Sequence, residues 1–334
     1  MKRRDFAISL LLAGAVRTVR AQEPAKQRRI AIVIPAGPVA QINDRASRYW
    51  QPFWEELRRL GDAEGHNLIV EAYSGGGRPA GYADLAREVT GRNPDVIIAI
   101  TGPVALAIRA ATGTTPIVWI GVDPIAGGLA TSLAHPGGNI TGVSLFDYET
   151  YAKRLQILKD TVPSASRVAY LSPRKGWETS GGQALRRAFR QVGQRLDMSV
   201  IPMLIEESTP AEYQRVFAEI VPERADGLIV PDLGDLLPYR QLIVELAQKS
   251  RLPAIFGLRD YVEAGGLMAY GADQGELYRR MADDVHEILD GTKPGDIPIY
   301  QATRFHLIIN LKAAEALGLT IPSPLLARAD EVIE

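Results

Sequence analysis

The sequence predicts an α/β protein built from two doubly wound parallel-sheet lobes with an interdomain cleft. Three observations lead to this prediction. Short, apolar, β-branched segments alternate with amphipathic helical segments, this alternation restarts at Arg167, and a chain of 334 residues is long enough for two domains. Segments that are apolar on both alternations are typical of parallel strands covered by helices on both faces.

Four strand segments define the first predicted lobe. Between them, the stretch that starts at Arg48 places Trp50, Phe53 and Leu57 on one helical face, and Gly61 follows its last turn. Strands that alternate with helices in this way form a parallel sheet. The four strand segments are 29–35, 67–73, 95–100 and 116–121.

The second predicted lobe repeats the same order of strands and helices without a sequence repeat of fixed period. Sheets of this kind bind ligands beyond the carboxyl ends of their strands, so two facing lobes predict one binding cleft between them. The strand segments of the second lobe are 167–172, 198–205, 227–231 and 252–257.

The N-terminus predicts export from the cytoplasm. Arg3 and Arg4 precede a short apolar stretch, and Val19 and Ala21 have the spacing that a signal peptidase cleaves, so residues 1–25 are interpreted as a signal peptide. The arginine pair is also typical of a twin-arginine signal, and an uncleaved anchor is the alternative.

Composition and motifs argue against several classes of function. The net charge of −1 without a basic block disfavours nucleic-acid binding, and the absence of cysteine excludes thiolate chemistry. The four histidines lack metal-ligand spacing, and neither a nucleophile elbow nor a phosphate-binding loop is present. We therefore predict no catalytic residue, no metal, no cofactor and no enzymatic activity.

Candidate ligand contacts in the first lobe follow three of its strands. Thr101 either binds an anion at the start of a helix or caps that helix. Asp123 either accepts a hydrogen bond from the ligand or caps a helix expected from Pro124. The candidates are Pro35, Ala36, Gly37, Thr101, Gly102, Pro103, Val122 and Asp123.

Candidate contacts in the second lobe are placed at predicted strand ends. The aromatic rings could stack on a flat ligand or anchor loops, and Asp232 could accept a hydrogen bond from an ammonium or hydroxyl group. These candidates are Ser172, Trp177, Asp232, Arg259, Tyr261 and Tyr270.

Two long runs carry a resemblance to a known family. PDVIIAITGPVALAIRAATGTTPIVWIGVDPIAGGLATSLAHPGGNITGVS and the C-terminal INLKAAEALGLTIPSPLLARADEVIE resemble the ABC transporter substrate-binding family that includes tryptophan/tyrosine-type binding proteins. The resemblance covers essentially all of the mature chain. It implies a type I periplasmic-binding fold, in which three crossovers join the lobes and hinge closure traps a small ligand.

The resemblance also implies domain limits and partners. Lobe 1 is expected at 28–145 plus 274–299, and lobe 2 at 146–273 plus 300–334. Asp123 is expected to meet the cleft, and the glycines at 137–138 to turn the chain toward lobe 2. The implied protein is a periplasmic monomer that serves an ABC permease and ATPase.

The ligand class expected from these residues is a small carboxylate, either an aromatic amino acid or an aromatic acid. Arg174 and Lys175 favour a carboxylated compound if they face the cleft, and they could equally point to solvent. Two alternatives to a transport receptor are a periplasmic α/β enzyme and a ligand-sensing domain that feeds a receptor.

Overall fold

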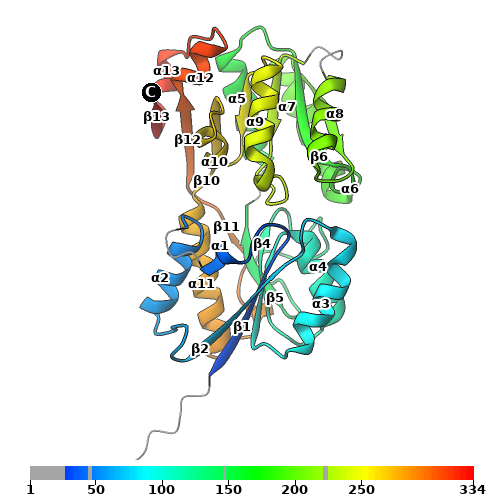
Figure 1. Ribbon diagram of the computed structural model, residues 1–334, viewed down its shortest axis with the longest axis vertical. Helices are drawn as coiled ribbons and strands as arrows, with labels where there is room; N and C mark the ends of the chain where they lie inside the picture. Colours follow the sequence, from blue (N-terminus) through cyan, green and yellow to red (C-terminus); the bar gives the residue numbers. More distant parts are fainter. Residues whose placement is uncertain (1–26, 44–46, 146–147, 221–224) are drawn as a thin grey trace, which may run out of the picture.

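A computed structural model describes residues 27–43, 47–145, 148–220 and 225–334 of the chain. The predicted signal peptide lies outside the described residues. Two sheets form two lobes that follow each other along the long axis of the molecule (Figure 1). Within the described part of the chain, no helix combines the length and apolar character needed to cross a membrane.

The first sheet has six strands, all parallel, in the order β2-β1-β3-β4-β5-β11. Its four central strands are fully buried or nearly so, as expected when helices cover both faces. The strands are β1 (Arg28–Ile34), β2 (Leu68–Ser74), β3 (Val96–Ile100), β4 (Ile117–Gly121), β5 (Ile140–Ser144) and β11 (Tyr300–Gln301).

The second sheet has seven strands in the order β7-β6-β8-β9-β10-β12-β13. Only the β10–β12 pairing in it is antiparallel. The strands are β6 (Arg167–Pro173), β7 (Ser199–Ile205), β8 (Gly227–Val230), β9 (Ala254–Phe256), β10 (Met268–Ala272), β12 (Phe305–Asn310) and β13 (Glu331–Ile333).

Both sheets share one topology. Within each lobe, the first five strands in chain order are arranged 2-1-3-4-5, so the strand order reverses between β1 and β3 in lobe 1 and between β6 and β8 in lobe 2. Ligands of open α/β sheets bind where the strand order reverses, beyond the carboxyl ends of the strands. The topology therefore defines one candidate binding edge on each lobe.

Helices cover both faces of each sheet (Figure 1). In lobe 1 they are α1 (Ala40–Asn43), α2 (Trp50–Arg59), η1 (Pro79–Gly81), α3 (Tyr82–Gly91), α4 (Gly102–Ala111), α11 (Gln274–Leu289) and η3 (Pro294–Asp296). In lobe 2 they are α5 (Tyr148–Thr161), α6 (Arg174–Trp177), α7 (Ser180–Leu196), α8 (Pro210–Ile220), η2 (Leu237–Tyr239), α9 (Arg240–Lys249), α10 (Arg259–Glu263), α12 (Leu311–Ala316) and α13 (Ser323–Leu326).

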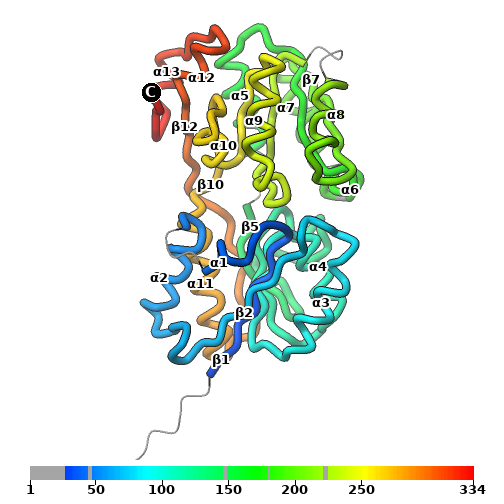
Figure 2. The backbone as a smooth tube through the Cα atoms, in the orientation of Figure 1, coloured from blue at the N-terminus to red at the C-terminus, as the bar shows by residue number. Residues whose placement is uncertain are grey.

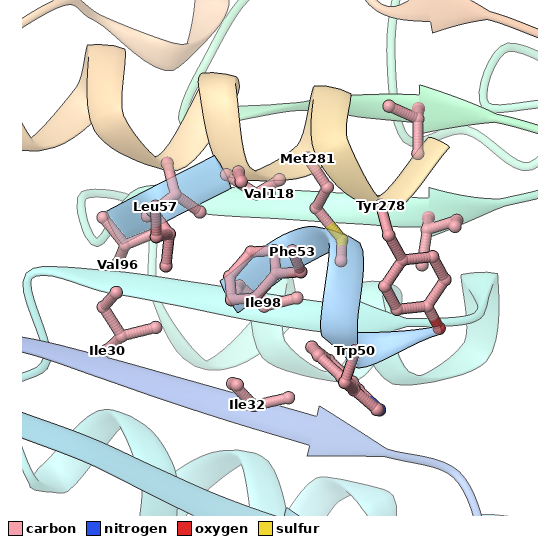
Figure 3. Packing of buried hydrophobic residues seen from close by; sticks show 14 of the residues in the cluster. Ile30, Ile32, Trp50, Phe53, Leu57, Val96, Ile98, Val118, Tyr278 and Met281 are labelled. Carbon is pink, nitrogen blue, oxygen red and sulfur yellow. The ribbon is translucent and has the colours of Figure 1, made fainter. Parts of the chain in front are cut away.

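The helix predicted from Arg48 forms as α2 and packs on α11, which lies far away in the sequence. Figure 3 shows Phe53 of α2 and Met281 of α11 packed among strand residues that include Ile98 and Val118. The Trp50 and Tyr278 rings meet edge to face with their centroids 5.1 Å apart. This apolar layer fixes α11 to lobe 1 although its residues follow most of lobe 2 in the chain.

The chain passes between the lobes three times, after β5, after β10 and between β11 and β12 (Figure 2). Tyr300 and Gln301 pair with Val143 and Ser144 of the first sheet. The expected boundary at residue 300 is therefore two residues too early, because β11 still belongs to the lobe 1 sheet. The C-terminal strands β12 and β13 complete the second sheet.

Candidate functional site

The two strand-order reversals face each other, and the loops that follow them touch. Gly234, in the loop after β8, is so close to lobe 1 that a Cβ built there would lie 3.5 Å from Thr101 Cγ2 and 3.9 Å from Pro35 Cγ. Pro35 follows β1 and Thr101 follows β3. The carboxyl ends of both sheets thus form one junction between the lobes.

The lobes also meet on either side of this contact. At one point, a Cβ built on Gly181 would lie 3.7 Å from Cβ of Ala126 in lobe 1. At another, the Tyr49 hydroxyl donates a hydrogen bond to the Asp260 carboxylate of α10. Contacts at several separate points mean that the lobes are closed on each other.

Thr101 has a strained backbone at the centre of the junction. Its φ of +83° and ψ of 153° fall in a region that β-branched residues avoid. The side chain does not cap α4, and its Oγ1 is buried without a hydrogen-bond partner among the described residues. The capping alternative therefore does not apply, and the hydroxyl is left available to a ligand.

Asp235 brings a second unsatisfied polar group to the junction, and the sequence analysis missed it. Its Oδ1 is buried without a hydrogen-bond partner in the described structure, and burial raises the pKa of its carboxyl to about 6. Burial and then the Asp235 charge raise the pKa of the Tyr82 phenol in lobe 1. The Asp235 carboxyl group of lobe 2 therefore lies near Tyr82 of lobe 1, and it directly follows Gly234, the residue that approaches Thr101.

The other lobe 1 candidates lie at the same edge as Thr101. Asp123 has a φ of +31°, and its Oδ1 accepts a hydrogen bond of 2.9 Å from the Ala126 amide. The helix expected from Pro124 does not form, because turns follow β4, so Asp123 caps a turn. The remaining candidates lie in the loop after β1 (Pro35, Ala36, Gly37), at the first turn of α4 (Gly102, Pro103) and directly after β4 (Val122).

Asp232 follows β8 and has an arginine partner that the sequence analysis did not identify. Arg154 of α5 is wholly buried, and its Nη2 lies 3.4 Å from Asp232 Oδ2. Its Nε donates a 2.8 Å hydrogen bond to the Tyr270 carbonyl, and its guanidinium lies 5.0 Å from the Tyr151 ring centre. Asp232 thus belongs to a buried ion pair at the carboxyl end of the second sheet.

Ser172 lies near the end of β6 and Trp177 at the end of α6, and both residues are buried. Trp177 is 9% exposed. Its ring centroid lies 5.7 Å from that of Tyr170, and the Arg186 guanidinium lies 5.2 Å from the ring centre. Ser172 is a buried β6 residue whose hydroxyl donates to the Pro173 carbonyl. This packing favours the loop-anchor interpretation of Trp177.

Tyr261 and Arg259 are placed in α10 rather than at a strand end. Tyr261 is fully buried and stacks on Phe256 with ring centroids 4.8 Å apart. Arg259 forms ion pairs with Glu263 at 2.7 Å and with Glu331 of β13. The structure therefore does not bring these two side chains together with Thr101.

Tyr270 does not lie at a strand end as expected, and Arg174, for which two orientations were left open, forms ion pairs within lobe 2. Tyr270 lies in the middle of β10, stacks on Phe305 at 5.8 Å and lines a groove of about 730 Å³ beside α5 and α7. Arg174 pairs with Glu206 and Glu178. Its charge is therefore matched within lobe 2.

Local sequence patterns gave no signal for Arg154 and only a weak one for Asp235. Arg154 sits in an amphipathic helix in which an arginine is ordinary, and only the tertiary structure buries it. Asp235 carried a weak signal, since PDLGDL follows a predicted strand at the same edge as Asp232. Among the described residues, no group of acidic or histidine side chains could hold a metal ion.

Comparison with known proteins places this geometry in a family. A model of the ABC transporter substrate binding protein family matches residues 40–333. A tyrosine-binding protein from Clostridioides difficile is 26% identical over 270 residues, which cover 80% of this chain and 75% of the relative.

Solved structures agree with the fold. A conserved domain protein from Vibrio cholerae O1 biovar eltor is 26% identical, with a TM-score of 0.82 over 92% of this chain and 100% of its own. An ABC domain from Streptococcus pneumoniae in complex with L-Trp has the same TM-score and coverage at 21% identity. The two-lobed α/β fold is therefore shared with periplasmic binding proteins.

The family whose model matches consists of substrate-binding proteins of ABC transporters and not of enzymes, so the family argues for a binding protein and against the alternative of a periplasmic α/β enzyme. Two similar sheets, three crossovers and a junction at the strand-order reversals are what such a protein needs to enclose a solute. The chain belongs to the ABC transporter substrate-binding protein family.

Proposed function

We propose that this receptor binds an aromatic amino acid, tyrosine or tryptophan, between its two lobes. The observation that carries the proposal is the meeting of both strand-order reversals at Gly234 and Thr101, with two buried and unsatisfied polar atoms, Thr101 Oγ1 and Asp235 Oδ1, on opposite sides. Unsatisfied buried polar groups are costly, and a polar ligand would satisfy them.

The relatives support the ligand class. One is named for tyrosine, and another was solved with L-Trp. An amino acid carries an ammonium group that a carboxylate such as that of Asp235 can bind, and a carboxylate that accepts hydrogen bonds from a hydroxyl or a guanidinium.

Calorimetry with L-tyrosine and L-tryptophan tests the proposal, with a sugar and a polyamine as controls. We expect saturable one-to-one binding and recovery of the unchanged amino acid. At a ligand concentration of one hundred times Kd, binding adds about 2.7 kcal/mol to the free energy of unfolding. Stabilisation by the sugar or polyamine but by no aromatic carboxylate would contradict the ligand class. If aromatic acids that lack an amine bind and the amino acids do not, Asp235 makes no contact with a ligand ammonium group.

We further propose that the protein works in the periplasm as a monomer that delivers its ligand to an ABC permease and ATPase. The arginine pair and the apolar stretch at the N-terminus support export. When the full-length gene is expressed, cell fractionation should recover the mature protein in the periplasm. A variant with both arginines changed to lysine separates the two export routes, since only twin-arginine export depends on that pair. Recovery in the cytoplasm would contradict this location.

A further inference from the structure

Arg154 stands out among the buried groups because its charge is removed from water and only partly matched. Its side chain is 0% exposed, and that of Asp232 is 6% exposed. Burial of a charge is costly unless hydrogen bonds and an opposite charge compensate for it. Arg154 must therefore find its partners inside the protein or in a bound ligand.

The partners within the protein do not satisfy the guanidinium. The two nitrogen–oxygen distances to Asp232 are 3.4 and 3.5 Å, whereas charge-assisted bonds are typically about 2.7 to 2.9 Å long. Nη2 has no hydrogen-bond partner among the described residues. The Asp232 carboxylate thus balances the charge of Arg154 but leaves a donor unused.

Two glycines mark where this donor lies. A Cβ built on Gly271, near the end of β10, would lie 3.7 Å from Arg154 Nη2. A Cβ built on Gly257, directly after β9, would lie 2.7 Å from Cβ of Asp232. The unused donor of α5 therefore lies near the carboxyl ends of β9 and β10, beside Asp232, the residue at which the loop toward Gly234 and lobe 1 begins.

We propose that Arg154 determines specificity by donating hydrogen bonds from Nη2 to the carboxylate of the bound ligand, while Asp232 holds the guanidinium in place. This inference rests on the proposed function and adds to it a requirement for a free carboxylate. A neutral carboxamide of the same shape offers one acceptor and no charge, so it binds more weakly. Arg154 thus separates amino acids from their amides and amines.

The test compares L-tyrosine with L-tyrosinamide, and L-tryptophan with L-tryptophanamide, by calorimetry. The wild-type protein is expected to prefer the acids by roughly 10- to 150-fold, the range for a hydrogen bond to a charged group. The double variant Arg154→Met with Asp232→Asn removes both buried charges together and is expected to reduce this preference to within about threefold. Arg154→Lys keeps the charge and is expected to retain part of the preference.

A matched control comes from α11, where Arg280 and the buried Asp284 form a pair with a 2.9 Å contact. Arg280→Met with Asp284→Asn removes an arginine–aspartate pair with a buried carboxyl and a partly exposed arginine from lobe 1, and should leave the acid preference unchanged. Thermal melting verifies that each variant is folded, and Arg154→Lys supplies the answer if the double variant is not.

The outcomes separate the two proposals. If the wild-type protein prefers the acids and the folded Arg154 variants keep the full preference, the role of Arg154 is refuted while the ligand class stands. A wild-type protein that binds acid and amide equally well refutes it too. If neither amino acid binds, the proposed ligand class fails, and the assignment of Arg154 fails with it.

Discussion

Arg48 of lobe 1 and Glu263 of lobe 2 form an ion pair across the junction, in which Arg48 Nη2 lies 2.7 and 2.6 Å from the two carboxylate oxygens. Beside it, Tyr49 donates to Asp260, and burial followed by the Asp260 charge raises the pKa of the Tyr49 phenol. Both contacts join the start of α2 to α10. They can form only when the lobes are closed, so they stabilise the closed state directly.

The first prediction concerns this ion pair. Arg48→Gln and Glu263→Gln are each expected to weaken ligand binding by about two- to fivefold, because both side chains are about 40% exposed and such pairs contribute at most about 1 kcal/mol. Calorimetry at low and high salt measures the effect, which salt should reduce. Because either single change already removes the ion pair, the double variant should bind the ligand about as well as the single variant with the lower affinity. Additive losses would show that the two residues act independently.

The second prediction separates the backbone and side chain of Thr101. Thr101→Gly removes the strain of φ +83° and is expected to raise the free energy of unfolding by about 1 kcal/mol, while ligand affinity falls. Thr101→Ala keeps the strain and loses the hydroxyl, and should weaken binding by about 1 to 3 kcal/mol. Thr101→Ser retains the hydroxyl as the control. Unchanged affinity in the alanine variant would remove Thr101 from the site.

The third prediction is a pH dependence of stability due to Asp235. Burial raises the pKa of its carboxyl from 3.8 to about 6, so the folded protein keeps a proton that the unfolded chain has already lost. The protonated Asp235 carboxyl therefore contributes to the free energy of unfolding, and this contribution is full below about pH 4 and is lost as the pH rises through 6. Asp235→Asn is neutral at every pH and should gain about 1 to 3 kcal/mol relative to wild type between pH 4 and 7.

Asp226 provides a control, because its pKa is shifted in the direction opposite to that of Asp235. Although burial opposes it, backbone hydrogen bonds from Ser166 and Arg167 lower the pKa of the Asp226 carboxyl. Its contribution is present above the unfolded pKa and is lost as the pH falls through the lowered folded pKa, so Asp226→Asn should destabilise the protein most at neutral pH. Urea unfolding at several pH values measures both variants. A difference between Asp235→Asn and wild type that stays flat from pH 4 to 7 would contradict the buried carboxyl.

The fourth prediction concerns Gly142 in β5. Its φ is +143°, and a Cβ there would lie 1.9 Å from the carbonyl oxygen of Trp119 in the neighbouring strand. Because two backbones would have to separate, Gly142→Ala should destabilise the fold by more than about 4 kcal/mol. Gly138→Ala has open space at a φ of +63° and should cost about 1 kcal/mol. Equal losses in urea unfolding would contradict this reasoning.

The strands at the two strand-order reversals could be predicted from the sequence, because the apolar pattern of a buried strand is local. Each of the eight predicted strand segments overlaps an observed strand, β1 to β4 or β6 to β9, since a buried parallel strand must be apolar on both faces. β5, which has Gly142 at its centre, was not among the predicted strands, because the resemblance implied that the chain turns toward lobe 2 at Gly137 and Gly138. That expectation is wrong, since both glycines precede a strand of the first sheet. Glycine is needed at position 142 because a Cβ there would collide with the backbone of Trp119 in the neighbouring strand β4.

The sequence by itself determined the two-lobe α/β architecture and the edge of each sheet at which a ligand is expected, because the alternation of apolar strands with amphipathic helices is encoded in neighbouring residues and implies parallel strands whose carboxyl ends share one edge. Only the tertiary structure decided which side chains reach that edge. Tyr261 lies in a core although it follows a strand closely, whereas Arg154 comes from a helix and lies beside Asp232. Burial and unsatisfied hydrogen bonds depend on contacts between distant segments, and no local pattern records those contacts.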